Sequence, residues 1–293
     1  LLGLVGSEMC IRDRHFTLSL DLFGSEISTN AANAFTAGVK GRFWETKIKD
    51  DHKLQNDTYP ILEFENNKIT EVQAIWDIPE LMMQAKAWPM APSLGREWCV
   101  PGPSTLDGIN EGKIFTEKSS SSLEHIVSMA NAMKRHPSEG GPELMELEKY
   151  WHKNMNWYGP SGIGSSRGID GFRNWHQIPF LNAMPDRGKL TSYDKKDGWG
   201  EDIFYHFFSE NEYVAVTGWP NMKQTISHDG WLGIAPVNKV ITLRSLDYWR
   251  LENGKIRENW VLVDLLDIYN QIGVNVFSRL KEFNKANTKG VYQ

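Results

Sequence analysis

The spacing of hydrophobic and polar residues divides the chain into a strand-rich beginning, a helical middle and a strand-rich end. Residues 15–23 alternate between the two classes, as a half-buried strand does. Residues 59–76 predict two strands around the asparagine pair at 66–67, which is typical of a tight hairpin turn. Asp77 then has the chemistry of a helix N-cap, so a helix is predicted over 77–88.

The middle of the chain loses its periodicity and then regains it. Residues 90–122 are rich in Pro, Gly and Ser and predict a linker or a long surface connection. Apolar residues at helical spacing return over 122–136, and a second helix is predicted over 142–154, which opens with a proline. A third helix is predicted over 170–184, with an interruption at Pro179.

The last third of the chain predicts two long hairpins and a closing helix. Residues 202–226 predict a hairpin that turns about Glu210-Asn211. Residues 239–263 predict another, which turns at the Asn-Gly pair 253–254, a pair that suits two-residue turns. The closing helix is predicted over 264–283.

Two segments share one order of elements. Residues 64–84 and 251–271 each run through a hairpin turn, a Lys-Ile pair, a strand, an aspartate and a helix, so that Asp77 aligns with Asp264. Such self-similarity predicts a tandem repeat whose first copy lacks its opening helices. The predicted domains are therefore a partial repeat over 15–92, a linker over 93–121, a complete domain over 122–285 and a tail over 286–293.

Composition and charge narrow the class of protein. The 293 residues carry a net charge of −5 without a long run of either sign, which argues against partners such as nucleic acid or a membrane surface. No apolar run approaches the roughly 20 residues of a membrane span. Cys10 and Cys99 form neither a disulfide framework nor a metal cluster, so a reducing, cytoplasmic location is expected. The eight histidines show no ligand spacing, so no metal is expected.

The first fourteen residues, LLGLVGSEMCIRDR, have neither an initiator methionine nor the flanking basic charge of a signal peptide. They resemble translated adapter sequence, and we expect them to be artefactual or disordered. On this interpretation natural sequence is also absent upstream.

The glycine-rich stretch GPSGIGSSRGIDGF, residues 159–172, raises the hypothesis of a phosphate-binding loop. A dinucleotide fingerprint requires a buried apolar strand before the loop and an uninterrupted helix after it. Here the preceding strand is short and polar at alternate positions, and Pro179 and Pro185 interrupt the following helix. The stretch also lacks the Gly-Lys-Ser or Gly-Lys-Thr ending of a Walker loop. The pattern favours a turn, with Asp170 as the cap of the helix that follows.

Two longer segments, residues 150–187 and 241–274, resemble the SnoaL-like polyketide cyclase family of the nuclear transport factor two-like superfamily. The most specific part is the pattern Arg-x-x-Asp-x-x-Arg-x-x-Asn-Gly-x-Ile, which runs from Arg244 to Ile256. The resemblance covers about residues 122–285. It implies an α+β fold in which a cone-shaped, curved antiparallel sheet and its helices enclose a deep apolar cavity.

The resemblance also implies a function. Family members of this kind bind a small apolar or aromatic carbonyl compound and use a carboxylate for acid/base catalysis without a cofactor. The expected reaction is cyclisation, isomerisation, dehydration or hydrolysis, and a homodimer or an intramolecular pairing of the two repeats is expected. The glycine-rich turn would carry the chain to a helix over the cavity mouth. The alternative is a non-catalytic ligand carrier or assembly module.

The catalytic candidates depart from the family pattern. The position of the family's catalytic Asp falls on Val261, and its pocket His falls on Asp247. Alternation places Asp247 on the same strand face as Leu243 and Trp249, where a carboxyl group is costly unless it is paired or functional. Asp247 is therefore the acid/base candidate, with an ion pair as the alternative. Asp264 is a second candidate, although its place after a strand also predicts a helix cap.

Histidines and aromatic residues complete the candidate site. His176 or His228 would form a proton-transferring dyad with Asp247, whereas a satisfied core or surface histidine is the alternative for each of them, as for His206. Tyr158 would donate a hydrogen bond to a carbonyl oxygen that gains charge. The aromatic residues predicted to line the cavity are Trp157, Tyr158, Trp175, Phe180, Trp219 and Trp249, with Trp199 and Trp231 as further candidates.

Overall fold

The structure, a computed structural model, describes residues 62–65, 68–72, 77–84, 87–96, 115–190, 197–199, 203–228 and 231–291. The predicted strand at 15–23, both cysteines and the first fourteen residues lie outside this part of the chain.

A seven-stranded sheet forms the centre of the fold. Its strand order is β4-β3-β9-β8-β7-β6-β5, and all neighbours are antiparallel except β3 and β9, which run parallel. The two long hairpins predicted from alternation are its largest part. The strands are β3 (Trp151–Tyr158), β4 (Ser166–Arg167), β5 (Asp197–Trp199), β6 (Phe204–Glu210), β7 (Tyr213–Ile226), β8 (Lys239–Glu252) and β9 (Lys255–Val263).

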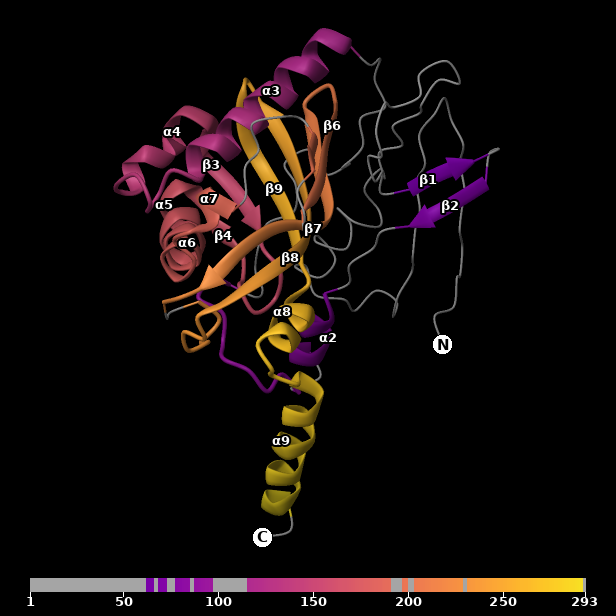
Figure 1. The fold of residues 1–293 in the computed structure, drawn as a ribbon, viewed down its shortest axis with the longest axis vertical. Coiled ribbons are helices and arrows are strands. Elements are labelled where there is room, and N and C mark those ends of the chain that lie inside the picture. The colour runs from indigo at the N-terminus through magenta and orange to yellow at the C-terminus, as the bar shows by residue number, and fades with distance from the viewer. Residues whose placement is uncertain are drawn as a thin grey trace.

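The sheet is strongly curved, and a bulge contributes to the curvature. β7 and β8 each have 14 residues, and both bend along their length in Figure 1. Between Gly218 and Met222 the β7 strand advances four residues while β8 advances two, from Ser245 to Leu243. Such bulges increase local twist and bend the strand that carries them. The bend gives the sheet a concave face that can enclose side chains.

Helices cover one face of this sheet, so the fold is the predicted α+β cone. α3 packs across β6 and β7, and α5 packs on β3. A continuous apolar core of Trp, Phe, Met and Leu side chains fills the space between them. The helices are α3 (Thr116–Met133), α4 (Leu147–Tyr150), α5 (Gly168–Phe172), α6 (Ile178–Ala183), α7 (Arg187–Leu190), α8 (Leu265–Gln271) and α9 (Val276–Val291), with a 3₁₀ turn at Pro142–Met145 and a π-helical turn at Arg173–Gln177.

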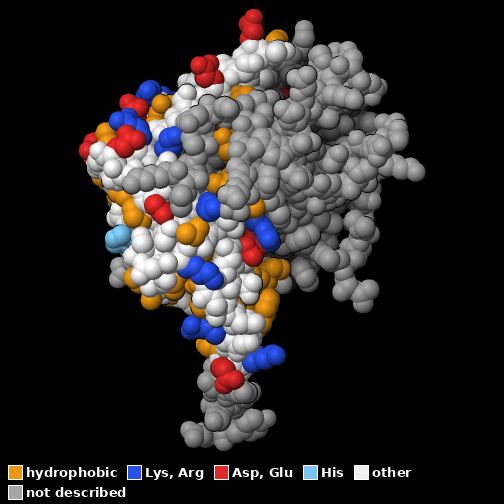
Figure 2. Space-filling model, viewed as in Figure 1, with side chains coloured by type: hydrophobic (Ala, Val, Ile, Leu, Met, Phe, Trp, Pro, Cys, Tyr) orange, Lys and Arg blue, Asp and Glu red, His pale blue; other side chains and the backbone are white. Residues whose placement is uncertain are grey.

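The surface agrees with the charge pattern of the sequence. Figure 2 shows acidic and basic side chains intermixed on the described part of one face, without a broad field of either sign. Within the described residues, no helix combines the length and the apolarity that are needed to cross a bilayer.

The N-terminal elements form a small hairpin and a helix. β1 (Leu62–Glu65) and β2 (Lys68–Val72) pair in a two-stranded sheet of their own, at a distance from the main sheet in Figure 1. α2 (Ile78–Gln84) follows, and the Asp77 carboxylate accepts a hydrogen bond from the Glu80 N–H at 3.0 Å, as the predicted cap requires. The hairpin and helix thus follow the predicted order, but a second cone-shaped copy is not seen among the described residues.

α2 and the segment after it lie against the C-terminal domain. The Ser161 N–H donates to Asp77 at 2.9 Å and the Ser161 hydroxyl donates to Glu80 at 2.5 Å. Burial raises the pKa of Asp77 to about 6. Arg96 and Ser165 exchange two backbone hydrogen bonds of 2.8 and 2.7 Å. The predicted boundary at residue 92 therefore lies between two places, at Asp77–Glu80 and at Gly95–Arg96, where the chain is hydrogen-bonded to the glycine-rich loop.

α3 begins at Thr116, six residues before the start predicted from periodicity. Its first two turns contain four serines, at 119–122, and carry no apolar stripe, so the pattern alone indicates a linker. Hydrogen bonds hold it as a helix: the Ser119 hydroxyl donates to the Phe115 carbonyl, and the Asn211 N–H donates to Ser119 Oγ at 2.7 Å. Phe115 N–H in turn donates to the Asn211 side chain at 2.8 Å.

The predicted helix over 142–154 ends at Tyr150, and residues from Trp151 continue as strand β3. Pairing with β9 gives this segment its strand conformation. Trp157 and Tyr158 lie beside Asn259 and Trp260 in parallel register. A tertiary partner of this kind overrides local helix propensity.

The β8–β9 hairpin turns where the sequence predicts. Asn253 and Gly254 both have positive φ, 50° and 71°, which is the geometry of a type I′ turn. On the outer face of the hairpin Arg250 lies opposite Glu258, and its guanidinium donates to that carboxylate. Glu258 is fully buried and Arg250 is 5% exposed. Three positions of the family-like pattern, Asp247, Arg250 and Asn253, thus lie in the β8–β9 hairpin.

Breaking this buried ion pair should destabilise the domain. We expect Glu258→Gln to lower the free energy of unfolding by about 3–5 kcal/mol, because the buried Arg250 cation loses its buried partner and keeps only Glu252, which is partly exposed. Glu139→Gln is the matched control, since Glu139 pairs with Arg135 at the surface and the change should cost about 1 kcal/mol or less. Urea denaturation measures both, and equal losses would contradict the interpretation.

Candidate active site

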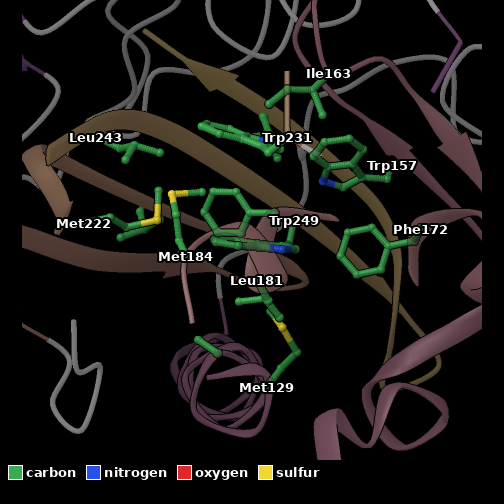
Figure 3. Packing of buried hydrophobic residues seen from close by; sticks show 14 of the residues in the cluster. Met129, Trp157, Ile163, Phe172, Leu181, Met184, Met222, Trp231, Leu243 and Trp249 are labelled. Carbon is green, nitrogen blue, oxygen red and sulfur yellow. The ribbon is translucent and has the colours of Figure 1, made fainter. Parts of the chain in front are cut away.

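A cavity of about 90 Å³ lies between the concave face of the sheet and the helices. Figure 3 shows the rings of Trp157, Phe172, Trp231 and Trp249 gathered in one region of the core. Most of the cavity wall is apolar, and few polar side chains reach the cavity. The polar lining residues are His176, Gln177, Arg187, Asn221, Asp247 and Asn259.

Three adjacent strands hold the acidic side chain of the cavity. Asp247 lies on β8, between Val216 of β7 and Val261 of β9. The Ser245 hydroxyl donates to Asp247 Oδ2 at 3.1 Å. Asn221 Nδ2 donates to Ser245 Oγ at 2.6 Å from the bulge of β7. This chain of hydrogen bonds fixes the orientation of the carboxyl group.

The environment of Asp247 changes its acidity. Burial raises the pKa of Asp247 to about 7, and hydrogen bonds from Ser245 and Asn259 together with the Arg187 charge oppose the rise. The desolvation of the carboxylate is the larger effect. Asp247 therefore exchanges protons near neutral pH, as a general acid or base requires.

The register of the hairpin places the two departures from the family pattern side by side. Val261, at the position of the family's acid, is the direct cross-strand partner of Asp247, and both line the cavity. Side chains opposite each other on one sheet face have Cβ atoms about 4.5–5.5 Å apart. The carboxyl group of Asp247 therefore lies beside the Val261 side chain in the same cavity.

His176 enters the cavity from the π-helical turn. Its ring stacks on Trp157, with ring centroids 3.9 Å apart and planes inclined by 15°. Phe172 and Phe180 contact its other sides. Burial, and then the Arg187 charge, lower the pKa of His176 to about 3, so the imidazole is neutral at physiological pH. Its Nδ1 has no hydrogen-bond partner in the described part of the chain.

Arg187 is a cavity residue that the sequence did not identify. It begins α7, is 8% exposed, and its guanidinium lies 3.6 Å from the sulfur of Met222 and 5.8 Å from the ring centroid of Phe180. Its charge lowers the pKa of both His176 and Asp247. In the sequence, only its place as the last residue of the family-like segment 150–187 distinguished it.

Two candidate catalytic residues lie away from the cavity. His228 is exposed, and its Nδ1 is 3.0 Å from the Ser227 hydroxyl. Asp264 caps α8, because it accepts a hydrogen bond from the Asp267 N–H at 3.0 Å, and it also pairs with Arg244 at 3.7 Å. Neither lines the cavity.

The predicted aromatic lining residues divide into three groups. Trp157, Phe180 and Trp249 line the cavity, as does Trp231. Tyr158 stacks on Trp260 at 5.5 Å and is absent from the lining, as is Trp175, which is 53% exposed.

The side chains of three further candidates, Trp199, His206 and Trp219, lie outside the described part of the chain. Trp175 lies instead in a surface pocket beside Arg96 and Arg167.

The glycine-rich loop shapes the wall of the cavity. A Cβ atom on Gly159 would lie 2.2 Å from the ring of Trp157, so only glycine allows the indole to fold back over the loop. Gly162 and Gly164 have φ of 94° and 84°, a conformation that favours glycine. The turn presents Ile163 to the cavity.

The described residues offer no cluster of metal ligands. No group of three His, Cys, Asp or Glu side chains comes together within this part of the chain.

Comparison with known proteins gives distant structural matches and one short match to a curated protein. An NTF2-like protein of Burkholderia xenovorans LB400 is 13% identical, over 53% of this chain and 98% of its own, with a TM-score of 0.35. TsrD of Streptomyces laurentii is 18% identical, over 55% and 98%, with a TM-score of 0.34. Benzoyl-CoA oxygenase component B of Aromatoleum evansii is 53% identical over 55 residues, which are 19% of this chain and 12% of that protein.

The family comparison concerns the strands that carry Asp247. Residues 206–272 match the model of the family described as SnoaL-like polyketide cyclase. The match extends from within β6 through β7, β8 and β9 to the end of α8. The similarity to the SnoaL-like polyketide cyclase family thus covers residues 206–272, which are part of the α+β fold described above.

Proposed function

We propose that the cavity binds a small aromatic or apolar carbonyl compound and catalyses proton transfer on it, without a cofactor, with Asp247 as the acid/base. The observation that carries the proposal is a carboxyl group with a pKa of about 7 in an aromatic cavity, oriented by Ser245. Catalytic carboxyl groups are tuned upwards in this way by burial. Cyclisation, isomerisation, dehydration and hydrolysis all contain such a step.

In the proposed first step the Asp247 carboxylate removes a proton from the carbon beside the substrate carbonyl. The C–H bond breaks, an O–H bond forms on Asp247, and the electron pair moves to the carbonyl oxygen as an enolate. Buried N–H donors stabilise such an oxygen. Trp231 and Trp249 line the cavity with Nε1 atoms that have no acceptor among the described residues. Asp247 then returns the proton, or the enolate carbon attacks a second carbonyl.

His176 has a binding role in this scheme. An imidazole with a pKa of about 3 is a weak base at neutral pH, and the contacts of the described residues include no hydrogen bond between His176 and Asp247. The neutral ring stacks on Trp157 and presents a nitrogen to bound carbonyl compounds.

A second candidate function is ligand binding without turnover. The observation that favours it is Val261, an apolar side chain at the position where the family pattern has its acid. The two functions differ in one measurable property, because only the first requires ionisation of Asp247.

Replacing Asp247 should abolish proton transfer and preserve the fold. We expect Asp247→Asn to slow exchange of the α-hydrogens of an aryl ketone such as acetophenone by about 10²–10⁴-fold, because the amide cannot take up the proton. Proton NMR in D₂O measures the exchange. Asp170→Asn is the matched control, since its carboxyl group is exposed at the surface and pairs with Arg173. Equal rates for wild type and Asp247→Asn would favour binding without turnover.

The pH profile should follow the same group. Asp247 acts as a base only when ionised, so kcat/KM for exchange should rise with pH through about 7 and level off above it. The rise should be absent in Asp247→Asn. A profile that is flat between about pH 5 and 9, or a rise that persists in the variant, would assign the base to another residue.

A further inference from the structure

A second pocket lies at the surface, apart from the cavity that holds Asp247. Its volume is about 520 Å³, which is typical of sites for small organic molecules. Residues 94–96 line it together with residues 165–167, Gly171 and Trp175. Much of the pocket is thus built by the second half of the glycine-rich stretch. The two sets of lining residues have no member in common.

Two large apolar side chains are exposed in this pocket. Trp175 is 53% exposed, Leu94 is 48% exposed, and both line the pocket. Burial of such side chains stabilises a fold, so their exposure loses that stabilisation. Apolar side chains that are gathered in one concave place are typical of a binding site, whereas single exposed ones are common. A flat aromatic ring would cover the indole by stacking on it.

The polar side chains of the pocket suit an anionic group. Arg167, at the end of β4, is exposed and lines the pocket, and a guanidinium can bind phosphate through two parallel N–H bonds. Ser166 also lines it, is 7% exposed, and has a hydroxyl without a hydrogen-bond partner in the described part of the chain. No carboxyl group is among the described lining residues, so none of them repels an anion.

The main chain around the pocket is held in place from two directions. Arg96 and Ser165 exchange backbone hydrogen bonds of 2.8 and 2.7 Å. Next to them, a Cβ atom on Gly95 would lie 2.7 Å from the carbonyl carbon of Gly164, so the two segments are in close contact. Arg167 is paired with Asn156 of β3. A ligand would therefore meet groups whose backbone is already ordered, which lowers the entropic cost of binding.

We propose that this pocket binds an aromatic phosphate ester with the chemistry of a nucleoside monophosphate, at a site separate from the proposed active site. The ring stacks on Trp175 and covers Leu94, and Arg167 binds the phosphate, with the Ser166 hydroxyl as a further donor. The site differs from a Walker loop or a dinucleotide-binding loop, because side chains hold the phosphate in place of successive main-chain N–H groups.

Adenosine monophosphate, adenosine and inorganic phosphate test the two halves of the site. Calorimetry gives the dissociation constants at about pH 8, where the phosphate ester is a dianion. We expect adenosine monophosphate to bind at least about tenfold more tightly than either smaller compound, because it alone engages both Arg167 and Trp175. Its advantage over adenosine should shrink as salt rises, since ions screen an exposed guanidinium. Equal affinity for either smaller compound, or no binding of adenosine monophosphate at about 10 mM, overturns the proposal.

Two substitutions, each with a matched control, test the two side chains. Arg167→Gln should lower the affinity for adenosine monophosphate to about that for adenosine, and Arg167→Lys should keep part of the difference because the charge remains. Arg279→Gln removes an exposed arginine of α9 outside the pocket and should change nothing. Trp175→Ala should weaken binding by about fivefold or more through the loss of stacking. Phe277→Ala, at a residue that is also 53% exposed but outside the pocket, should not.

The outcomes distinguish this site from the cavity. A phosphate preference that survives Arg167→Gln, or an affinity that survives Trp175→Ala, overturns the proposal. Asp247→Asn should bind adenosine monophosphate as the wild type does, because Asp247 does not line this pocket; loss of binding there would place the ligand in the cavity and overturn the proposal. Absence of α-hydrogen exchange in the wild type overturns the proposed function alone. Thermal unfolding checks that Arg167→Gln is folded; if it is not, Arg167→Lys and the three ligands with the wild type decide.

Discussion

The register of β8 against β9 is the constraint on which the candidate site depends. Successive side chains of a strand point to opposite faces, so a slip of one residue would exchange the two faces of the hairpin. Asp247 would then leave the cavity and Arg250 would lose its place opposite Glu258. The turn at Asn253-Gly254 and the buried Arg250–Glu258 pair both fix the same register. Stability on the outer face of the hairpin and chemistry on its inner face are therefore set by one alignment.

Within that alignment, the properties of the cavity follow from the burial of its titratable side chains. The same burial that raises the pKa of Asp247 lowers that of His176, because each shift disfavours the charged form. One wall thus holds a carboxyl group that exchanges protons near neutral pH and an imidazole that stays neutral. Asn221 reaches Ser245 only because the β7 bulge adds residues opposite β8. The curvature of the sheet and the orientation of the acid have a common origin.

Much of the fold could be predicted from the sequence, because its signals are local. Alternation placed the two C-terminal hairpins, the Asn-Gly pair placed a turn, and Asp77 and Asp264 marked the starts of α2 and α8. Where the prediction failed, distant partners decide the structure. Ser119 forms part of a helix through its contact with Asn211, and the residues from Trp151 pair with β9.

The candidate site, like the fold, was predictable where its signals are local. Alternation was enough to place Asp247 beside Trp249 on an apolar face, and both line the cavity. Arg187 and Asn221 gave no periodic signal, because one reaches the cavity from a four-residue helix and the other from a bulge. The exposure of Trp175 and the stacking of Tyr158 on Trp260 depend on which way a strand or helix faces, which residue type alone does not determine.

The contacts of Ser161 have a consequence for where this domain begins. The family match starts at residue 206, yet the loop that carries Ile163 into the cavity is bound by Asp77 and Glu80 and, at Ser165, by Arg96. These partners precede the matched region by more than a hundred positions. A chain shortened to start after residue 96 would keep every strand of the main sheet, but the loop that carries Ile163 would lose these hydrogen-bond partners.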